Sequence, residues 1–281
     1  MATQKYQLTQ TQKTMVFVLS MCLYGLSNLL TELIPEFRIG IVELSVEYFA
    51  FIPLTLCMLF DPLSAALGAS TGEVIFGEIM LGQFGGFGEV EKFITFALAM
   101  YIAGVLVRDP RNKVSVAFAA IGGVAIHQFF SCTIDILKVQ FAIEDFEAIE
   151  GLPQSVVLTE GFSFLNDVLF SGILFALLPT LYLVPRLYGK IEPLLGIKPR
   201  DPETAPAISG ALIGKLLVMA IVTFVVATGF EFMAESGINI IDWEADWAES
   251  TPVIAGAVAV SLIGALVVVG LLYNRGKNKA S

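Results

Sequence analysis

The chain has 281 residues, of which 56% are hydrophobic and only 15% are charged, and its mean hydropathy is +0.79. This apolar content lies well above the roughly 45–50% of soluble domains, which excludes an ordinary water-soluble protein. The net charge of −10 argues against a nucleic-acid partner. Because the charges fall between long apolar runs, the composition indicates a protein embedded in the lipid bilayer.

The apolar runs predict an all-α polytopic membrane protein with eight spans. A bilayer core about 30 Å thick needs about 20 residues of helix. The first span is too long for the apolar part of a signal peptide and has no small-residue cleavage site after it, so we expect it to stay in the protein. In chain order the predicted spans are Met15–Leu33, Val42–Phe60, Leu63–Met80, Phe93–Val107, Val114–Leu137, Phe164–Val184, Ala211–Met233 and Val253–Tyr273.

The lysines and arginines predict how the spans are oriented. With eight spans both termini share one side, which then receives twelve of the sixteen basic residues, against three on the other side and one, Lys215, near the start of a span. The positive-inside rule makes the basic side cytoplasmic. We therefore expect a cell-membrane protein with both termini in the cytoplasm and acidic loops outside.

A proline-rich stretch predicts the domain organisation. Residues 1–196 would form a six-span substrate-binding unit, 197–210 a cytoplasmic linker, and 211–281 a two-span hairpin. A chain that ends near Gly196 is then expected to insert and bind ligand. Cys22, Cys57 and Cys132 fall inside predicted spans, and we expect no disulfide or redox role for them.

The intramembrane polar residues predict where a ligand binds. Most of them fall in the outer half of their spans, and a charge in the hydrocarbon core costs several kcal/mol unless it faces protein or water. We therefore expect them to meet in an outward, hydrated pocket, although outer-end carboxylates can also lie simply at the headgroup level. The candidate substrate-binding residues are Glu32, Arg38, Glu47, Glu73, Glu78, His127, Gln128, Asp135, Asn166 and Asp167. A second polar stripe on the first span, Ser20, Tyr24, Ser27 and Thr31, either lines this pocket or joins helices.

Two stretches resemble a known transporter family. The run from Asp61-Pro62 through small residues to Glu73, and the run Ala103-Gly104-Val105-Leu106-Val107-Arg108, are similar to parts of the S components of energy-coupling-factor transporters. The resemblance extends over about residues 15–186. The first span lacks the Ala-x-x-x-Ala patch common in that family, and the last two spans are additional to its six-helix unit.

The resemblance implies a substrate-binding subunit of a micronutrient importer. Its outward pocket would be roofed by residues 34–40, where Arg38 is the only cation, and its partners would be a T-type membrane subunit and two ATPase subunits. ATP hydrolysis would belong to those partners, because the chain has no G-x-x-x-x-G-K-[ST] motif.

The carboxylate-rich pocket predicts a cationic or amine-bearing small molecule, with cation–π contacts from nearby aromatic rings. We predict no catalytic residue, no cofactor and no metal site, since a single histidine excludes an imidazole-rich nickel or cobalt centre. Two alternatives stay open. One is a self-sufficient secondary transporter in which Glu73, Asp135 and Asp167 carry protons or sodium ions. The other is an intramembrane lipid-modifying enzyme.

Overall fold

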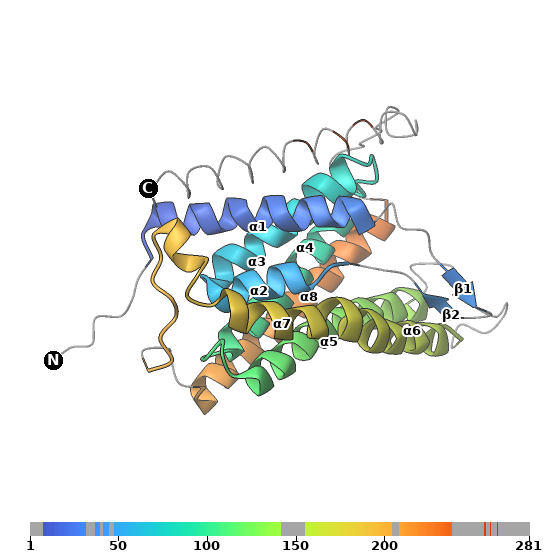
Figure 1. Cartoon of the computed structure of the whole chain (residues 1–281). Coiled ribbons are helices and arrows are strands. Elements are labelled where there is room, and N and C mark those ends of the chain that lie inside the picture. The colour runs from blue at the N-terminus through green and yellow to red at the C-terminus, as the bar shows by residue number, and fades with distance from the viewer. Residues whose placement is uncertain are drawn as a thin grey trace.

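The computed structural model describes residues 8–31, 37–39, 42–44, 48–141, 155–203 and 208–237, together with positions 256, 259 and 263. In this part of the chain, helices pack against one another in a bundle, with a small hairpin at one end (Figure 1). The elements are α1 (Gln10–Thr31), β1 (Phe37–Ile39), β2 (Val42–Leu44), α2 (Phe51–Leu59), α3 (Pro62–Gly72), η1 (Glu73–Ile79), α4 (Gly88–Leu106), α5 (Lys113–Gln140), α6 (Ser155–Asn166), η2 (Asp167–Leu177), α7 (Leu178–Leu187), η3 (Glu192–Leu195) and α8 (Gly210–Glu235).

Four segments are long and apolar enough to cross a membrane by length and composition. They are α1, α5, the continuous run Ser155–Leu187 that joins α6, η2 and α7, and α8. The chain is therefore a helical protein with several membrane-compatible segments, as its composition predicts. The full count of eight spans stays a prediction, and the eighth, Val253–Tyr273, falls almost wholly outside the described residues.

The predicted second span, Val42–Phe60, is wrong as a continuous helix. Its first residues form β2, which pairs antiparallel with β1 and sets Arg38 opposite Glu43. In the described part of this range, only Phe51–Leu59 is helical. Nine helical residues extend about 14 Å, less than half of the hydrocarbon thickness. The β-branched and apolar residues of Val42–Leu44 suit a strand as well as a helix, so an apolar run alone does not separate the two.

The third and fourth predicted spans are helical with different bounds. The third begins at Pro62, where Asp61 caps the helix by accepting hydrogen bonds from the Ser64 backbone N–H (2.9 Å) and hydroxyl (2.6 Å), and Pro62 occupies the first turn. The fourth begins at Gly88, five residues earlier than predicted. The earlier start places three charged residues, Glu89, Glu91 and Lys92, on the helix.

Glycines bring α1 and α3 into backbone contact. A Cβ on Gly72 would overlap the Met21 carbonyl oxygen, and one on Gly68 would overlap that of Phe17. Spaced four residues apart, Gly68 and Gly72 form the small-residue face that lets membrane helices pack closely. The Ser20 hydroxyl adds a hydrogen bond of 2.7 Å to the Ala65 carbonyl oxygen, so part of the polar stripe on α1 does join helices.

The segment that follows α7 packs back onto the bundle, at the end opposite the hairpin (Figure 1). Ile197 is buried in the main hydrophobic core. The Gln12 side-chain amide of α1 donates a hydrogen bond of 2.6 Å to the Gly196 carbonyl oxygen. Residues 188–203, which include the start of the predicted linker 197–210, are thus attached to the helices beside them. We call these residues the strap.

Helix α8 lies against α4 and α5, where Leu216 joins Leu98, Ile102 and Phe130 in a second hydrophobic cluster. Most of its other surface is apolar and exposed, as at Leu217 and Val225. Such a helix suits a lipid environment on its outer face.

Candidate functional site

The clearest polar site lies where the end of α5, the end of α8 and the start of α4 come together. At its centre the Lys138 ammonium is 3.0 Å from the Asp135 carboxylate, 3.0 Å from that of Glu231 and 3.7 Å from that of Glu235. The Lys138 side chain is only 10% exposed. One mostly buried cation is therefore shared by three carboxylates on two helices.

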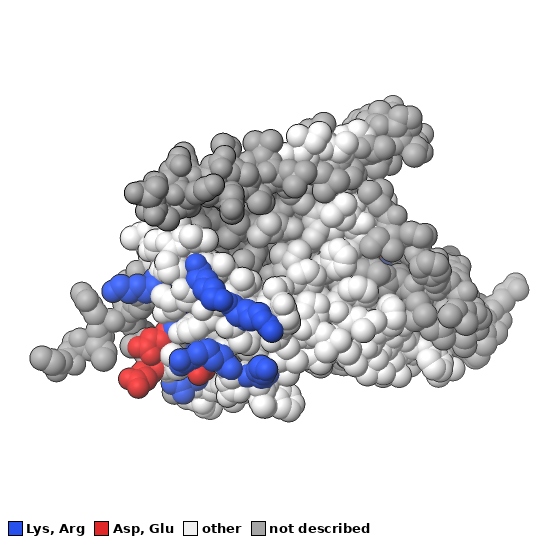
Figure 2. Space-filling view, viewed as in Figure 1, with Lys and Arg blue, Asp and Glu red and all other residues white. Residues whose placement is uncertain are grey.

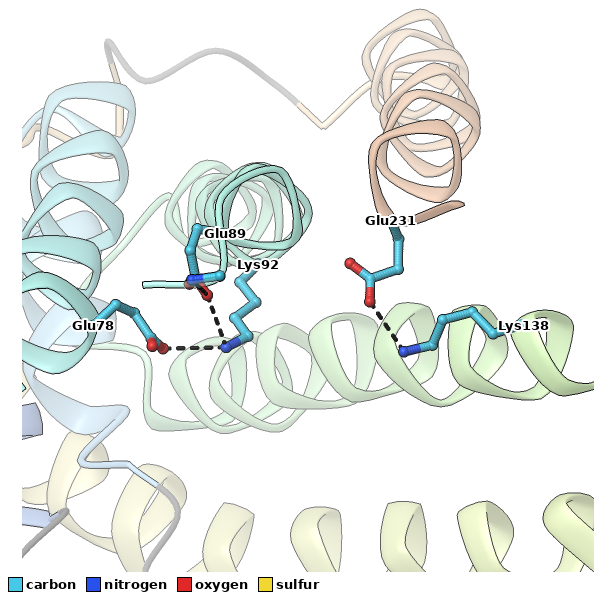
Figure 3. Close-up of polar contacts among 6 residues, drawn as sticks. Glu78, Glu89, Lys92, Lys138 and Glu231 are labelled. Atoms are coloured by element: carbon cyan, nitrogen blue, oxygen red, sulfur yellow. Dashed lines mark hydrogen bonds and ion pairs between the residues drawn. The ribbon is translucent and has the colours of Figure 1, made fainter. Parts of the chain in front are cut away.

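A second lysine lies nearby with its own carboxylates. The Lys92 ammonium is 3.2 Å from the Glu78 carboxylate of η1 and 3.4 Å from that of Glu89 on its own helix. Glu89 also accepts a hydrogen bond of 3.3 Å from the Gly85 backbone N–H. Figure 3 shows Glu78 and Glu89 pointing toward Lys92, and Glu231 pointing toward Lys138 from the neighbouring helix.

Glu91 connects the two lysine groups. Its side chain is buried, within electrostatic range of Glu231, Asp135 and Lys92, and it accepts a hydrogen bond of 3.4 Å from the Thr95 hydroxyl. A Cβ on Gly88 would lie 3.2 Å from a Glu231 carboxylate oxygen, which shows how closely α4 approaches α8 here. We call the resulting set the acidic cluster. It comprises six carboxylates and two ammonium groups, namely Glu78, Glu89, Glu91, Lys92, Asp135, Lys138, Glu231 and Glu235.

The acidic cluster is rich in carboxylates relative to its cations. Attraction between opposite charges is strengthened where water is largely excluded, and so is repulsion between like charges. A further cation that approaches this end of the bundle therefore meets a net negative field. Within the described residues, no three His, Cys, Asp or Glu side chains are arranged to hold a metal ion.

His127 belongs to a different group, in the interior of the bundle. Its ring makes T-shaped contacts with the rings of Tyr48 and Phe96, with centroid separations of 5.8 and 5.2 Å. Its Nδ1 is 3.4 Å from the Tyr48 hydroxyl oxygen. Tyr24 stacks on Phe96 at 5.0 Å. These rings pack against one another, so His127 is part of an aromatic core there. Gln128 is buried on the same helix.

Two other predicted residues begin π-helical turns. Glu73 begins η1, and Asp167 begins η2 directly after Asn166, whose side-chain amide donates to Asp167 at 3.3 Å. Wide helical turns of this kind are uncommon and often occur at functional positions. Each interrupts a helix at an acidic residue, one in the α3 segment and one in the α6–α7 segment.

The candidate substrate-binding residues that the structure describes lie on several helices and take part in different local contacts. Glu78 and Asp135 join the acidic cluster, His127 joins the aromatic core, and Asn166 and Asp167 lie at the η2 junction. Arg38 is on β1, and nothing further is described of its side chain. Glu32 and Glu47 lie outside the described residues.

Sequence reasoning missed six members of the acidic cluster as site residues: Glu89, Glu91, Lys92, Lys138, Glu231 and Glu235. Lys92 and Lys138 are two of the three basic residues that the sequence places on the outer side, just beyond the ends of predicted spans, but both lie on helices. The sequence does contain a signal for these ion pairs. Glu89 and Lys92 are three residues apart, as are Asp135 and Lys138, and this spacing brings side chains together on a helix.

The opposite end of the bundle carries mainly basic side chains. Figure 2 shows Lys and Arg gathered there with a few acidic residues beside them. One local ion pair joins Arg111 to Asp109 at 3.1 Å. Although slight burial raises the pKa of the Asp109 carboxyl, hydrogen bonds from the Arg111 backbone N–H and guanidinium lower it overall. The exposed basic residues described at this end are Lys13, Arg111, Lys113, Arg186, Lys190 and Lys198.

A helical bundle with four membrane-compatible segments and oppositely charged ends has the features of a multi-pass membrane protein. The chain belongs to a protein family of unknown function, DUF8171, whose model matches residues 15–281. The match includes the region after residue 196, so the family unit extends beyond the first six predicted spans. No curated protein and no solved structure matches the chain.

Proposed function

We propose that this protein is a solute-binding membrane subunit that takes up a cationic or amine-bearing small molecule at the acidic end of the bundle. The observation that carries the proposal is the coordination of Lys138, whose ammonium is shared by carboxylates of α5 and α8. An amine of a solute has the same charge and hydrogen-bonding capacity as this ammonium. The surrounding carboxylates are therefore suited to such a group.

The excess of carboxylates supports a cation in preference to a neutral or anionic solute. Glu91 adds a buried carboxylate beside Asp135 and Glu231, and its nearest described hydrogen-bond donor is a neutral hydroxyl. An incoming cation relieves repulsion among these groups, whereas an anion adds to it. Import by a complex with a T-type subunit and ATPases, as the resemblance implies, is the form of transport we propose.

The experiment is gentle purification from the native membrane, followed by mass spectrometry of every protein and small molecule that stays bound. We expect an amine-bearing molecule to be retained by the unaltered protein and to be lost from Glu91→Gln. The matched control is Glu203→Gln, an exposed carboxylate in the strap, which is expected to retain it. Recovery of a neutral or anionic molecule that survives Glu91→Gln would contradict the proposed solute class.

The same experiment decides how uptake is energised. Co-purification of a membrane subunit with two ATPases supports the importer. Recovery of the chain alone favours the second candidate, a cation-coupled secondary transporter. The π-helical turns at Glu73 and Asp167 are the observation that favours this second candidate, because irregular helices with polar groups mark binding sites in such transporters.

A further inference from the structure

The strap brings one side chain, Arg200, to the ends of two helices far away in the sequence. Its Nη1 donates to the carbonyl oxygens of Gly104 (2.8 Å) and Val107 (2.6 Å) at the end of α4. Its Nη2 donates to those of Cys57 (3.2 Å) and Phe60 (2.8 Å) at the end of α2. A single guanidinium therefore bonds four backbone carbonyl groups on two helices.

These carbonyl groups explain why an arginine is required. The last carbonyls of a helix have no partner within it and carry the negative end of the helix dipole. A guanidinium is planar and permanently charged, and it presents five donors in a fixed fork that reaches both helices together. An ammonium has only one nitrogen from which to donate, so Lys at position 200 would not reproduce the four contacts.

The backbone of the strap is itself held in position. The Tyr188 hydroxyl donates a hydrogen bond of 2.6 Å to the Arg200 carbonyl oxygen, and the Arg108 guanidinium donates one of 3.0 Å to that of Pro202. The Arg111 guanidinium lies over the Tyr188 ring, 5.5 Å from its centroid. These bonds fix the strap backbone at Arg200 and at Pro202, and so hold the Arg200 side chain beside the helix ends.

Beneath Arg200 the ends of α2 and α4 are tightly closed. Cys57 is fully buried, and a Cβ on Gly104 would lie only 2.7 Å from the Cys57 carbonyl oxygen and 2.9 Å from the Pro62 Cβ. Burial lowers the pKa of Arg200, but a guanidinium stays protonated at physiological pH. A change of pH therefore does not free these helix ends.

We propose that Arg200 is a latch that keeps the basic, cytoplasmic end of the bundle shut, and that its withdrawal separates α2 from α4 to let a solute leave toward the cytoplasm. The exit of a solute rests on the proposed function, while the closure of the helix ends does not. Arg200 acts as a positioning residue, since it bonds the helix ends and not the acidic cluster.

Cys57 provides a native reporter of this closure. The chain has three cysteines, so Cys22→Ser and Cys132→Ser together leave Cys57 as the only thiol. The measurement is its rate of alkylation by a membrane-impermeant maleimide, in inside-out and in right-side-out vesicles. We expect very slow labelling in this background, and at least a tenfold faster rate with Arg200→Gln in inside-out vesicles only. Arg200→Lys should fall between the two.

Two controls separate a latch from general loosening. Lys190→Gln removes an exposed positive charge from the strap and should leave Cys57 labelling unchanged. A second background, in which Cys132 on α5 is the only cysteine, should keep its labelling rate when Arg200→Gln is added.

The proposal is overturned if Cys57 stays unreactive in Arg200→Gln. It is also overturned if the Cys132 rate rises in step with that of Cys57, because the whole fold would then have loosened. Labelling needs no solute, so a failure of the latch is distinguishable from a failure of solute binding.

Discussion

The two ends of the bundle are held together by different chemistry. At the basic end, a cation bonds neutral backbone carbonyl groups, and α2 and α4 approach so closely that only glycine fits at position 104. At the acidic end, Lys92 and Lys138 pair with side-chain carboxylates that outnumber them. At the basic end, Arg200 supplies hydrogen bonds to backbone carbonyl groups that lack partners at any helix end. At the acidic end, the carboxylates exceed the lysines, so negative charge is in surplus.

This difference supports the two proposals, closure at the basic end and solute binding at the acidic end. The carbonyl groups around Arg200 have no competing use, so its contacts serve to hold α2 and α4 together. The carboxylates around Lys138 are the groups that we propose bind the solute's cation. We therefore expect changes at the basic end to act on packing, and changes at the acidic end to act on charge.

The largest expected effect is at the basic end. In Gly104→Val the new side chain would overlap Cys57 and Pro62, at a cost of about 3 kcal/mol, the upper end for overpacking. Thermal unfolding of the purified protein in detergent measures this as a large fall in Tm. The control is Gly161→Val on α6, where a Cβ meets nothing within 4 Å. Equal losses of Tm in both variants would show that Gly104 is not specially constrained.

The next effect separates the two lysines of the acidic cluster. Lys138→Met leaves Asp135, Glu231 and Glu235 without their shared cation, and we expect a loss of about 2 kcal/mol, below that of a fully buried pair because two of these carboxylates are about a third exposed. The Lys92 side chain is 50% exposed, so Lys92→Met should cost less than about 1 kcal/mol. Tm at low salt measures both. A larger loss for Lys92→Met would reverse the assignment of Lys138 as the central cation.

A smaller effect concerns the support of the latch. Tyr188→Phe removes one hydroxyl donor to the Arg200 carbonyl oxygen and should cost about 1 kcal/mol. The control is Tyr182→Phe, at an exposed position on α7. Both are measured by Tm, and an unchanged Tm in Tyr188→Phe would mean that Arg200 needs no support from this hydroxyl.

The smallest effect is a pH dependence at the basic end. Because hydrogen bonds from Arg111 lower the pKa of Asp109 in the folded protein, this carboxylate stabilises the fold fully above its unfolded pKa of about 3.9. That contribution is lost as the pH falls through the lower folded value. In Asp109→Asn the decline of Tm between about pH 5 and pH 3 should be slightly shallower than in the unaltered protein. If Tm falls equally in both proteins over this pH range, Asp109 does not make the inferred contribution to stability.

Local features of the sequence predicted much of the helical framework. The apolar runs predicted helices at the positions of α1, α5, the α6–α7 segment and α8, because the length and hydrophobicity of a helix are properties of a continuous stretch. The residues at which the helices and strands begin were less predictable. Val42–Leu44 forms a strand and α4 begins at Gly88, since apolar content does not mark where a helix starts.

The separation of acidic from basic residues along apolar helices can be read from the amino-acid sequence, because it depends on their order along the chain. Which of these residues meet depends on the three-dimensional packing. Lys138 and Glu231 are 93 residues apart, and Arg200 and Cys57 are 143 apart. Such contacts depend on which helices become neighbours and how each is rotated about its axis. Both follow from packing between helices, as at Gly68, Gly72 and Gly104, and not from the local sequence around each charge.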